Sequence, residues 1–250
     1  VGLAIFKHID LVFALPVMLV LGMVVIYDYR PVFYLLIFSI PFSLHVELGA
    51  TLAIDMPTEP LMIVMLFVFI LESLSGRQFQ RKGKIYGFHL LILLIIFWAG
   101  YTTLLSEIPA RSIKYLLAKM WYLASFVYMA QRIIKTSEDV KRVFWAFFSS
   151  MLLVVIFVTI RHAAVGFSFE EAHAISYPLY LNGVDYAATL AMFMPWLYHA
   201  RTWYSPKSLQ WYFIIAGTVL FLIAIITAYK RMGWVAVLSG PIVYFLIRLK

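Results

Sequence analysis

Apolar stretches long enough to cross a membrane follow one another along almost the whole chain, with only short charged segments between them. A helix needs about 20 mostly apolar residues to span the hydrocarbon core of a bilayer. The chain contains no long hydrophilic block that would fold as a separate soluble domain. Hydrophobic residues form 64% of it and charged residues 13%, a balance typical of proteins that lie mostly in lipid. The sequence therefore predicts an all-α integral membrane protein with a single transmembrane domain over residues 1–250.

The apolar stretches and the charges that flank them predict about nine transmembrane helices. The candidate helices cover residues 10–27, 31–46, 58–74, 86–105, 112–130, 143–161, 183–200, 211–228 and 232–248. The expected fold is therefore a polytopic transmembrane helical bundle.

Lys and Arg are distributed unevenly over the connections between these helices. If the nine helices alternate in direction, thirteen of the 20 Lys and Arg residues fall on one face and six on the other. The positive-inside rule makes the first face cytoplasmic. The formal net charge of +8 thus indicates membrane topology rather than a nucleic-acid-binding surface, and we expect no nucleic-acid partner.

Four of the cations that this topology disfavours are candidate ligands. Lys230 and Arg231 stand between two apolar runs in "ITAYKRMGWVAV", on the outer face. Arg111 and Lys119 share one face of the fifth predicted helix, because they are eight residues apart. Cations on separate helices beneath an outer membrane surface suit an anionic lipid head group, and Arg can bind a diphosphate at two points. We therefore predict that these residues bind a lipid diphosphate.

Each candidate also has a simpler structural interpretation. Lys230 and Arg231 can terminate two helices and extend their charges to the membrane interface. Lys119 can pair with a carboxylate such as Glu107 or Asp185. Asp185, which we add to the predicted lipid-diphosphate site, lies in the first turn of a predicted helix and can cap that helix or stabilise its dipole.

The sequence indicates no metal site and no cofactor. The chain has no Cys, which excludes disulfides and thiolate ligands. His162 and His173 lie in the longest outer loop with Glu170 and Glu171, but their spacing matches no established pattern of metal ligands.

Three segments of the chain form an ordered pattern. The first is "SEIPARSIKYLLAKMWYL", the second runs from the long outer loop into "NGVDYAATLAMFMPWLYHA", and the third is "FLIAIITAYKRMGWVAVLSGPIVYFLI". This progression resembles the O-antigen ligase and O-antigen polymerase superfamily of membrane proteins. There, an Asn-containing loop opens a helix that ends in an LxLPLxL-like run, here "LAMFMPWLY", and a later helix ends in a Thr/Ser-x-Ser-Arg-Gly/x-x-Trp-like turn, here "TAYKRMGW". Tyr229 and Lys230 depart from the small residue and serine that precede the family arginine.

The resemblance implies an inverting, metal-independent glycosyltransferase similar to the polytopic lipid-linked-sugar enzymes. Its expected partners are membrane lipid, a glycan donor linked to undecaprenyl diphosphate, and a glycan or lipid acceptor, which meet at the outer face of the bacterial inner membrane. Arg231 matches the family arginine that holds the donor diphosphate, whose negative charge grows as the sugar leaves. The family has further helices and an outer loop with an arginine and a histidine after this turn. We therefore expect the chain to be incomplete at its C-terminus, and the catalytic base stays unassigned.

Two other classes of function compete with the transferase. A transporter or flippase predicts internal repeats and a site formed by broken helices near the membrane midplane. The sequence shows no repeat, although Gly240 and Pro241 can interrupt the last predicted helix. A non-catalytic assembly subunit predicts that the cations contact only lipid or partner proteins.

Overall fold

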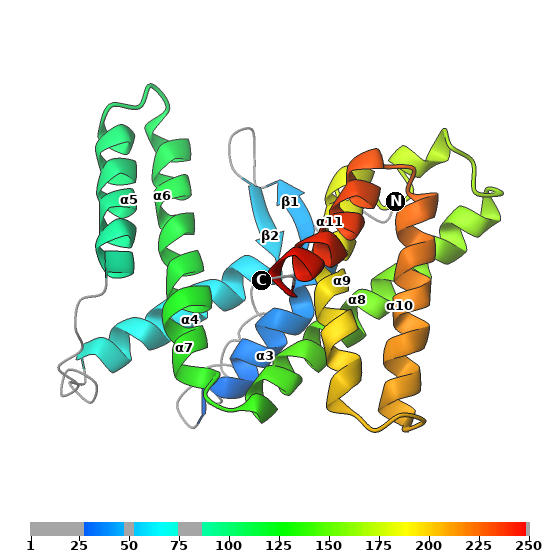
Figure 1. Ribbon diagram of the computed structural model, residues 1–250. Helices are drawn as coiled ribbons and strands as arrows, with labels where there is room; N and C mark the ends of the chain where they lie inside the picture. Colours follow the sequence, from blue (N-terminus) through cyan, green and yellow to red (C-terminus); the bar gives the residue numbers. More distant parts are fainter. Residues whose placement is uncertain (1–27, 48–52, 75–86, 249–250) are drawn as a thin grey trace, which may run out of the picture. The chain divides into compact units, whose positions relative to one another are not determined.

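The computed structural model describes residues 28–47, 53–74 and 87–248, and most of these residues are helical (Figure 1). The helix predicted at 10–27 lies outside the described residues. The other predicted helices all have a helical counterpart, so the coarse prediction of a mostly helical protein is confirmed.

The chain divides into two compact units. Unit 1 comprises Val1–Ile40 and Val46–Ala146, and unit 2 comprises Pro41–His45 and Phe147–Lys250. The single transmembrane domain over residues 1–250 stays a prediction.

Unit 1 is built from helices that contact α4 and from one helical hairpin. α4 (Thr58–Leu74) contacts α3 (Arg30–Ser39), α6 (Pro109–Leu123) and the π-helical continuation of α6 (Ala124–Met129). α5 (Gly87–Leu104) contacts α6, to which a short turn joins it (Figure 1). The remaining elements before α8 are the short helix α7 (Ala130–Ile133) and the two strands of a hydrogen-bonded pair, β1 (Leu44–Glu47) and β2 (Ala53–Met56).

Unit 2 contains most of α8 and the three helices that follow it. α8 (Ser137–Ala164) begins in unit 1 and ends in unit 2, where a loop with a 3₁₀ turn leads to α9 (Gly183–Ala200). α9 contacts both α10 (Leu209–Thr227) and α11 (Arg231–Arg248).

Three buried phenylalanines form an aromatic cluster where α8, α9 and α10 meet. The ring centroids of Phe148, Phe193 and Phe221 lie 6.0 to 6.5 Å apart. All three side chains are at most 5% exposed. Gly217 of α10 lets the helix approach the Phe148 ring, because a Cβ at this position would lie 2.5 Å from the ring carbon Cζ.

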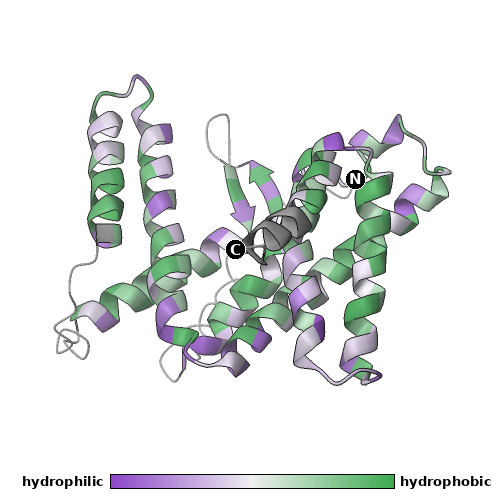
Figure 2. Ribbon diagram, viewed as in Figure 1, coloured by the Kyte–Doolittle hydropathy of each residue, from purple (hydrophilic) through white to green (hydrophobic). Residues whose placement is uncertain are grey.

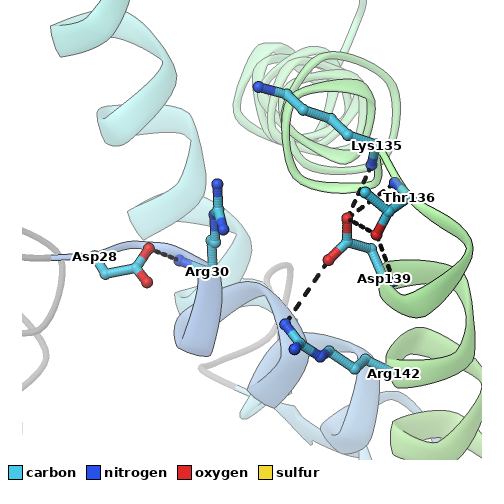
Figure 3. A network of polar contacts seen from close by, with 6 residues as sticks. All are labelled: Asp28, Arg30, Lys135, Thr136, Asp139 and Arg142. Carbon is cyan, nitrogen blue, oxygen red and sulfur yellow. Dashed lines mark hydrogen bonds and ion pairs between the residues drawn. The ribbon is translucent and has the colours of Figure 1, made fainter.

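The start of α8 is fixed by a reciprocal cap (Figure 3). The Asp139 carboxylate accepts hydrogen bonds from the backbone N–H groups of Lys135 and Thr136, and the Asp139 N–H donates to the Thr136 hydroxyl oxygen at 3.2 Å. This is the capping-box arrangement that satisfies backbone donors at a helix start. Arg142 lies 3.8 Å from the same carboxylate. These charged residues therefore have a structural role at the predicted cytoplasmic end of α8.

The boundaries of two predicted helices are confirmed to the residue, at 58–74 and 183–200. The helix predicted at 31–46 is wrong in its second half, because α3 ends at Ser39 and is followed by a 3₁₀ turn and strand β1. Pro41 explains the early end, since it has no backbone N–H to continue the α-helical hydrogen bonds. The pair of strands that follows departs from the purely helical expectation.

Two described helices are long and apolar enough to cross a membrane, α8 with 28 residues and α10 with 19. Figure 2 shows the hydrophobic character of α10 along most of its length. Most exposed side chains of α5 are also apolar, and Leu91, Phe97 and Leu104 are 59%, 71% and 85% exposed. Exposed apolar surface of this extent marks a contact with lipid or another protein. These helices support a membrane protein, as the composition predicts.

The contact of Gly217 with Phe148 generates a stability prediction. We expect Gly217→Ala to lower the thermal midpoint of the purified full chain in detergent, because the new methyl group must displace a buried ring at a cost of about 1–3 kcal/mol. Gly100→Ala in α5 is the matched control, since nothing lies within 4 Å of its added Cβ. Alanine improves helix propensity there by up to about 1 kcal/mol. Equal midpoints for the two variants would contradict the close approach of α10 to α8.

Candidate functional site

The first turn of α9 is held by its N-cap, Asn182. The Asn182 Oδ1 atom accepts hydrogen bonds from the backbone N–H groups of Val184 at 2.9 Å and Asp185 at 3.0 Å. Its amide group donates to Asp185 Oδ2 at 2.9 Å. The carboxylate of Asp185 also lies at the positive end of the helix dipole. The observed contacts of Asp185 are thus those of helix capping, and its part in a lipid-diphosphate site stays a prediction.

A tight turn connects α10 to α11 and carries the two predicted cations. Tyr229 adopts a left-handed conformation with φ of 53°, which ends α10, and Arg231 is the first residue of α11. A bulky residue seldom adopts this backbone conformation. The Tyr229 hydroxyl donates to the carbonyl oxygen of Phe167 at 3.1 Å. This contact joins the turn to the segment between α8 and α9 (165–182), which is the predicted outer loop.

Lys230 makes a second contact between this turn and the outer loop. Its Nζ lies 2.7 Å from His173 Nδ1. A lysine ammonium group only donates, so His173 Nδ1 accepts and the ring proton lies on Nε2. We call Phe167, His173, Tyr229 and Lys230 the turn cluster.

Gly183 allows the turn cluster to pack against the start of α9. A Cβ at this position would lie 2.9 Å from the carbonyl oxygen of Ala172 and 3.1 Å from Lys230 Cε. Only a residue without a side chain leaves room for both neighbours. The outer loop, the first residue of α9 and the turn before α11 therefore meet at one place in unit 2.

The two histidines singled out in the sequence, His162 in the last turn of α8 and His173 in the loop that follows, both make polar contacts. His162 is buried, and its Nε2 lies 3.1 Å from the carbonyl oxygen of Ser168, so this nitrogen carries the proton and donates. The His162 ring packs against the rings of Phe167 and Tyr229. His173 uses its free lone pair to accept from Lys230. Both histidines thus support the fold of the loop and the turn.

Tyr180 is a protonated donor beside the first turns of α9. Burial raises the pKa of the Tyr180 hydroxyl to about 12, a nearby hydrogen bond with Thr189 acts in the opposite direction, and the negative charge of Asp185 adds to the rise. The hydroxyl donates to the sulfur of Met151 at 3.5 Å. At neutral pH this side chain therefore does not accept a proton from a substrate.

Arg231 is exposed, in contrast to the partly buried Lys230. Within the part of the chain that the structure describes, no carboxylate forms an ion pair with Arg231. Its guanidinium group lies at the positive end of α11, where an anion is favoured. An anionic group at this turn could therefore accept hydrogen bonds from the guanidinium group of Arg231.

The predicted residues of α6 lie in unit 1 and have separate surroundings. Arg111 is exposed in the first turn of the helix. Lys114 forms an ion pair with Glu59 at 3.8 Å, and that carboxylate is almost buried. Lys119 has no ion pair with Glu107 or another carboxylate among the described residues of unit 1, and its pairing with Asp185 of unit 2 stays a prediction.

The structure thus brings together some of the predicted residues. Lys230 and Arg231 are adjacent at the turn, and Lys230 contacts Gly183 at the start of the helix that carries Asp185. Arg111 and Lys119 lie on α6 of unit 1, and their joining with the turn into one lipid-diphosphate site stays a prediction. Sequence reasoning missed the contact of Lys230 with His173, which joins residues 57 positions apart.

Comparisons of the chain with family models, curated proteins and solved structures gave no match. Among the described residues, no three His, Asp or Glu side chains lie close enough to hold a metal ion.

The tight packing around Gly183 generates the second prediction. We expect Gly183→Ala to displace the outer loop at Ala172 and to break the contact between Lys230 and His173. A cost of about 1 kcal/mol to the packed state would raise the fraction of undocked loop about fivefold. Limited chymotrypsin digestion of the purified full chain measures this change, because Phe169 in the loop is exposed.

Val184→Ala is the matched control for this experiment. The Val184 side chain is 49% exposed and follows Gly183 directly, so its truncation changes the same helix start without a new clash. If both variants are cleaved at the wild-type rate, the loop does not depend on the space at Gly183.

Proposed function

We propose that the protein is a multi-pass bacterial inner-membrane protein of the O-antigen ligase and polymerase type. In this proposal it forms a polytopic bundle of about nine helices, binds a glycan linked to undecaprenyl diphosphate at the outer membrane face, and transfers the glycan to a glycan or lipid acceptor. The observation that carries the proposal is the cationic turn of Lys230 and Arg231, which the outer loop and the start of α9 hold in place.

The position of the turn supports binding at a membrane surface. α10 is one of the two helices with the length and composition to cross a membrane, and the turn follows directly at its end. The uneven distribution of Lys and Arg favours an outer location for this end. A lipid-linked diphosphate has its charge at the same level, between the acyl region and water.

The charges of the turn suit a diphosphate. Arg231 offers a planar fork of donors that can contact two phosphate oxygens, and Lys230 adds a compact positive charge. His173 is neutral when it accepts from Lys230, so this contact leaves the lysine charge uncompensated. The turn therefore presents two positive charges and the start of helix α11.

The same arrangement suits the proposed transfer step. The acceptor hydroxyl oxygen forms a bond to the anomeric carbon of the sugar, while the bond from that carbon to the diphosphate oxygen breaks. The bonding electrons leave with the diphosphate, so negative charge grows on its oxygens. Donors already in place at that position stabilise the transition state without rearrangement. We assign this role to Arg231. The acceptor hydroxyl releases its proton to water, and we assign no residue as the base.

Arg231→Ala tests the proposal. We expect the variant to bind an undecaprenyl-diphosphate-linked oligosaccharide at least tenfold more weakly, since hydrogen bonds to a charged group contribute about 1.5–3 kcal/mol. Glycan transfer by the full chain in membranes should fall in parallel. The measurements are the dissociation constant for the purified protein in detergent and the amount of glycan transferred.

Arg201→Ala is the control, because Arg201 follows the C-terminal end of α9, opposite to Gly183. Its Cζ atom lies 4.1 Å from the centroid of the Tyr198 ring. This variant should bind the donor like the wild type. Unchanged donor affinity in Arg231→Ala would contradict the proposed site. Weaker binding with translocation of the donor, but without transfer to an acceptor, would instead favour a flippase.

A further inference from the structure

A pocket of about 300 Å³ lies between α5 and α6, within unit 1. Its polar lining comes from the end of α5, the connecting turn and the part of α6 up to Lys119. The lining residues with polar side chains are Thr102, Thr103, Ser106, Ser112, Tyr115 and Lys119. The pocket therefore combines several hydroxyl groups with one cation.

One pair of hydroxyls can donate into the pocket. The Oγ atoms of Ser106 and Ser112 lie 2.6 Å apart, and Ser106 Oγ also accepts from the backbone N–H of Ile108. Only one of the two hydroxyl protons is needed for the contact between the serines, so the other can bind a ligand oxygen. Thr102 and Thr103 donate to the carbonyl oxygen of Ala99 and line the wall with their methyl and hydroxyl groups.

The charge of the pocket is positive. Lys119 is exposed, and no carboxylate in the described ranges pairs with it, whereas Lys114 on the same helix is paired with Glu59. Tyr115 lies one turn from Lys119 and lines the same pocket. A neutral sugar would leave the Lys119 charge uncompensated, but an anion would neutralise it.

The helix α5, which forms one wall of the pocket, carries exposed apolar side chains. Leu93, Leu94 and Phe97 of α5 are all more than half exposed. Lys119 follows the first residue of α6 by ten positions, which places its Cα about 15 Å along the helix. In a hydrocarbon layer a lysine without a countercharge is strongly unfavourable. A ligand that fits both features has an anionic group for Lys119 and acyl chains for the exposed surface of α5.

We propose that the α5–α6 pocket binds the phosphate group of a membrane lipid, with Lys119 as its countercharge and the Ser106–Ser112 pair as hydrogen-bond donor. The inference rests on the lining of this pocket and not on the proposed transferase activity. The phosphate can belong to an anionic glycerophospholipid of the bilayer or to an isoprenoid diphosphate, and both sources present the same oxygens to the pocket.

The test measures lipid affinity by native mass spectrometry of the purified full chain. One series adds phosphatidylglycerol, and a second adds undecaprenyl diphosphate. We expect Lys119→Gln to weaken binding of one of these lipids about tenfold, while Lys119→Arg, which keeps the charge, retains most of the affinity. Ser112→Ala should weaken the binding of the same lipid by a smaller factor, because it removes one hydrogen-bond donor and leaves the charge of Lys119.

Lys135→Gln is the matched control, since Lys135 is an exposed lysine outside the pocket, just before α8. If Lys119→Gln loses affinity for phosphatidylglycerol alone, the ligand is a bilayer lipid. If it loses affinity for undecaprenyl diphosphate alone, the ligand is the isoprenoid. Unchanged affinity for both lipids, or an equal loss in Lys135→Gln, overturns the proposal. The effect of Arg231→Ala on donor binding is measured in a separate experiment. Either proposal can therefore be contradicted without the other.

Discussion

The packing of α9 against its neighbours is the constraint on which the candidate diphosphate site depends. The aromatic cluster of Phe148, Phe193 and Phe221 joins α9 to α8 and α10, and α9 also contacts α11. Because α9 is fixed on these sides, its first residue, Gly183, has a fixed position against Lys230. The orientation of two cations at a surface turn thus follows from apolar contacts several helical turns away.

The polar contacts of the turn cluster restrain the turn before α11, in addition to the apolar packing of α9. Tyr229 keeps a rare left-handed conformation, and its hydroxyl is tied to Phe167. His173 accepts from Lys230 and so restrains the lysine without neutralising it. An ion pair with a carboxylate would restrain Lys230 equally well, but it would remove the charge that an anionic ligand needs. A neutral histidine partner is therefore suited to a binding site in a way that an aspartate is not.

Local signals explain which parts of the structure could be predicted from the sequence. The helix at 183–200 follows an Asn cap and carries an apolar run, and both signals lie within the helix or directly before it. The strands β1 and β2 were missed because they are four residues each and lie between apolar helices. The contacts of Lys230 with His173 and of Lys114 with Glu59 were missed because each joins distant segments, which helical spacing does not relate.

Charge compensation separates the cations of α6 into two kinds. Lys114 faces α4, where the nearly buried Glu59 neutralises it, so this pair belongs to the packing of unit 1. Lys119 faces α5, which carries no charged side chain along its length and offers only hydroxyls near its end. Helix-to-helix packing can therefore neutralise the first lysine but not the second. Among the described residues of unit 1, Lys119 has no carboxylate partner, and the phosphate of a membrane lipid is the anion that we propose for it.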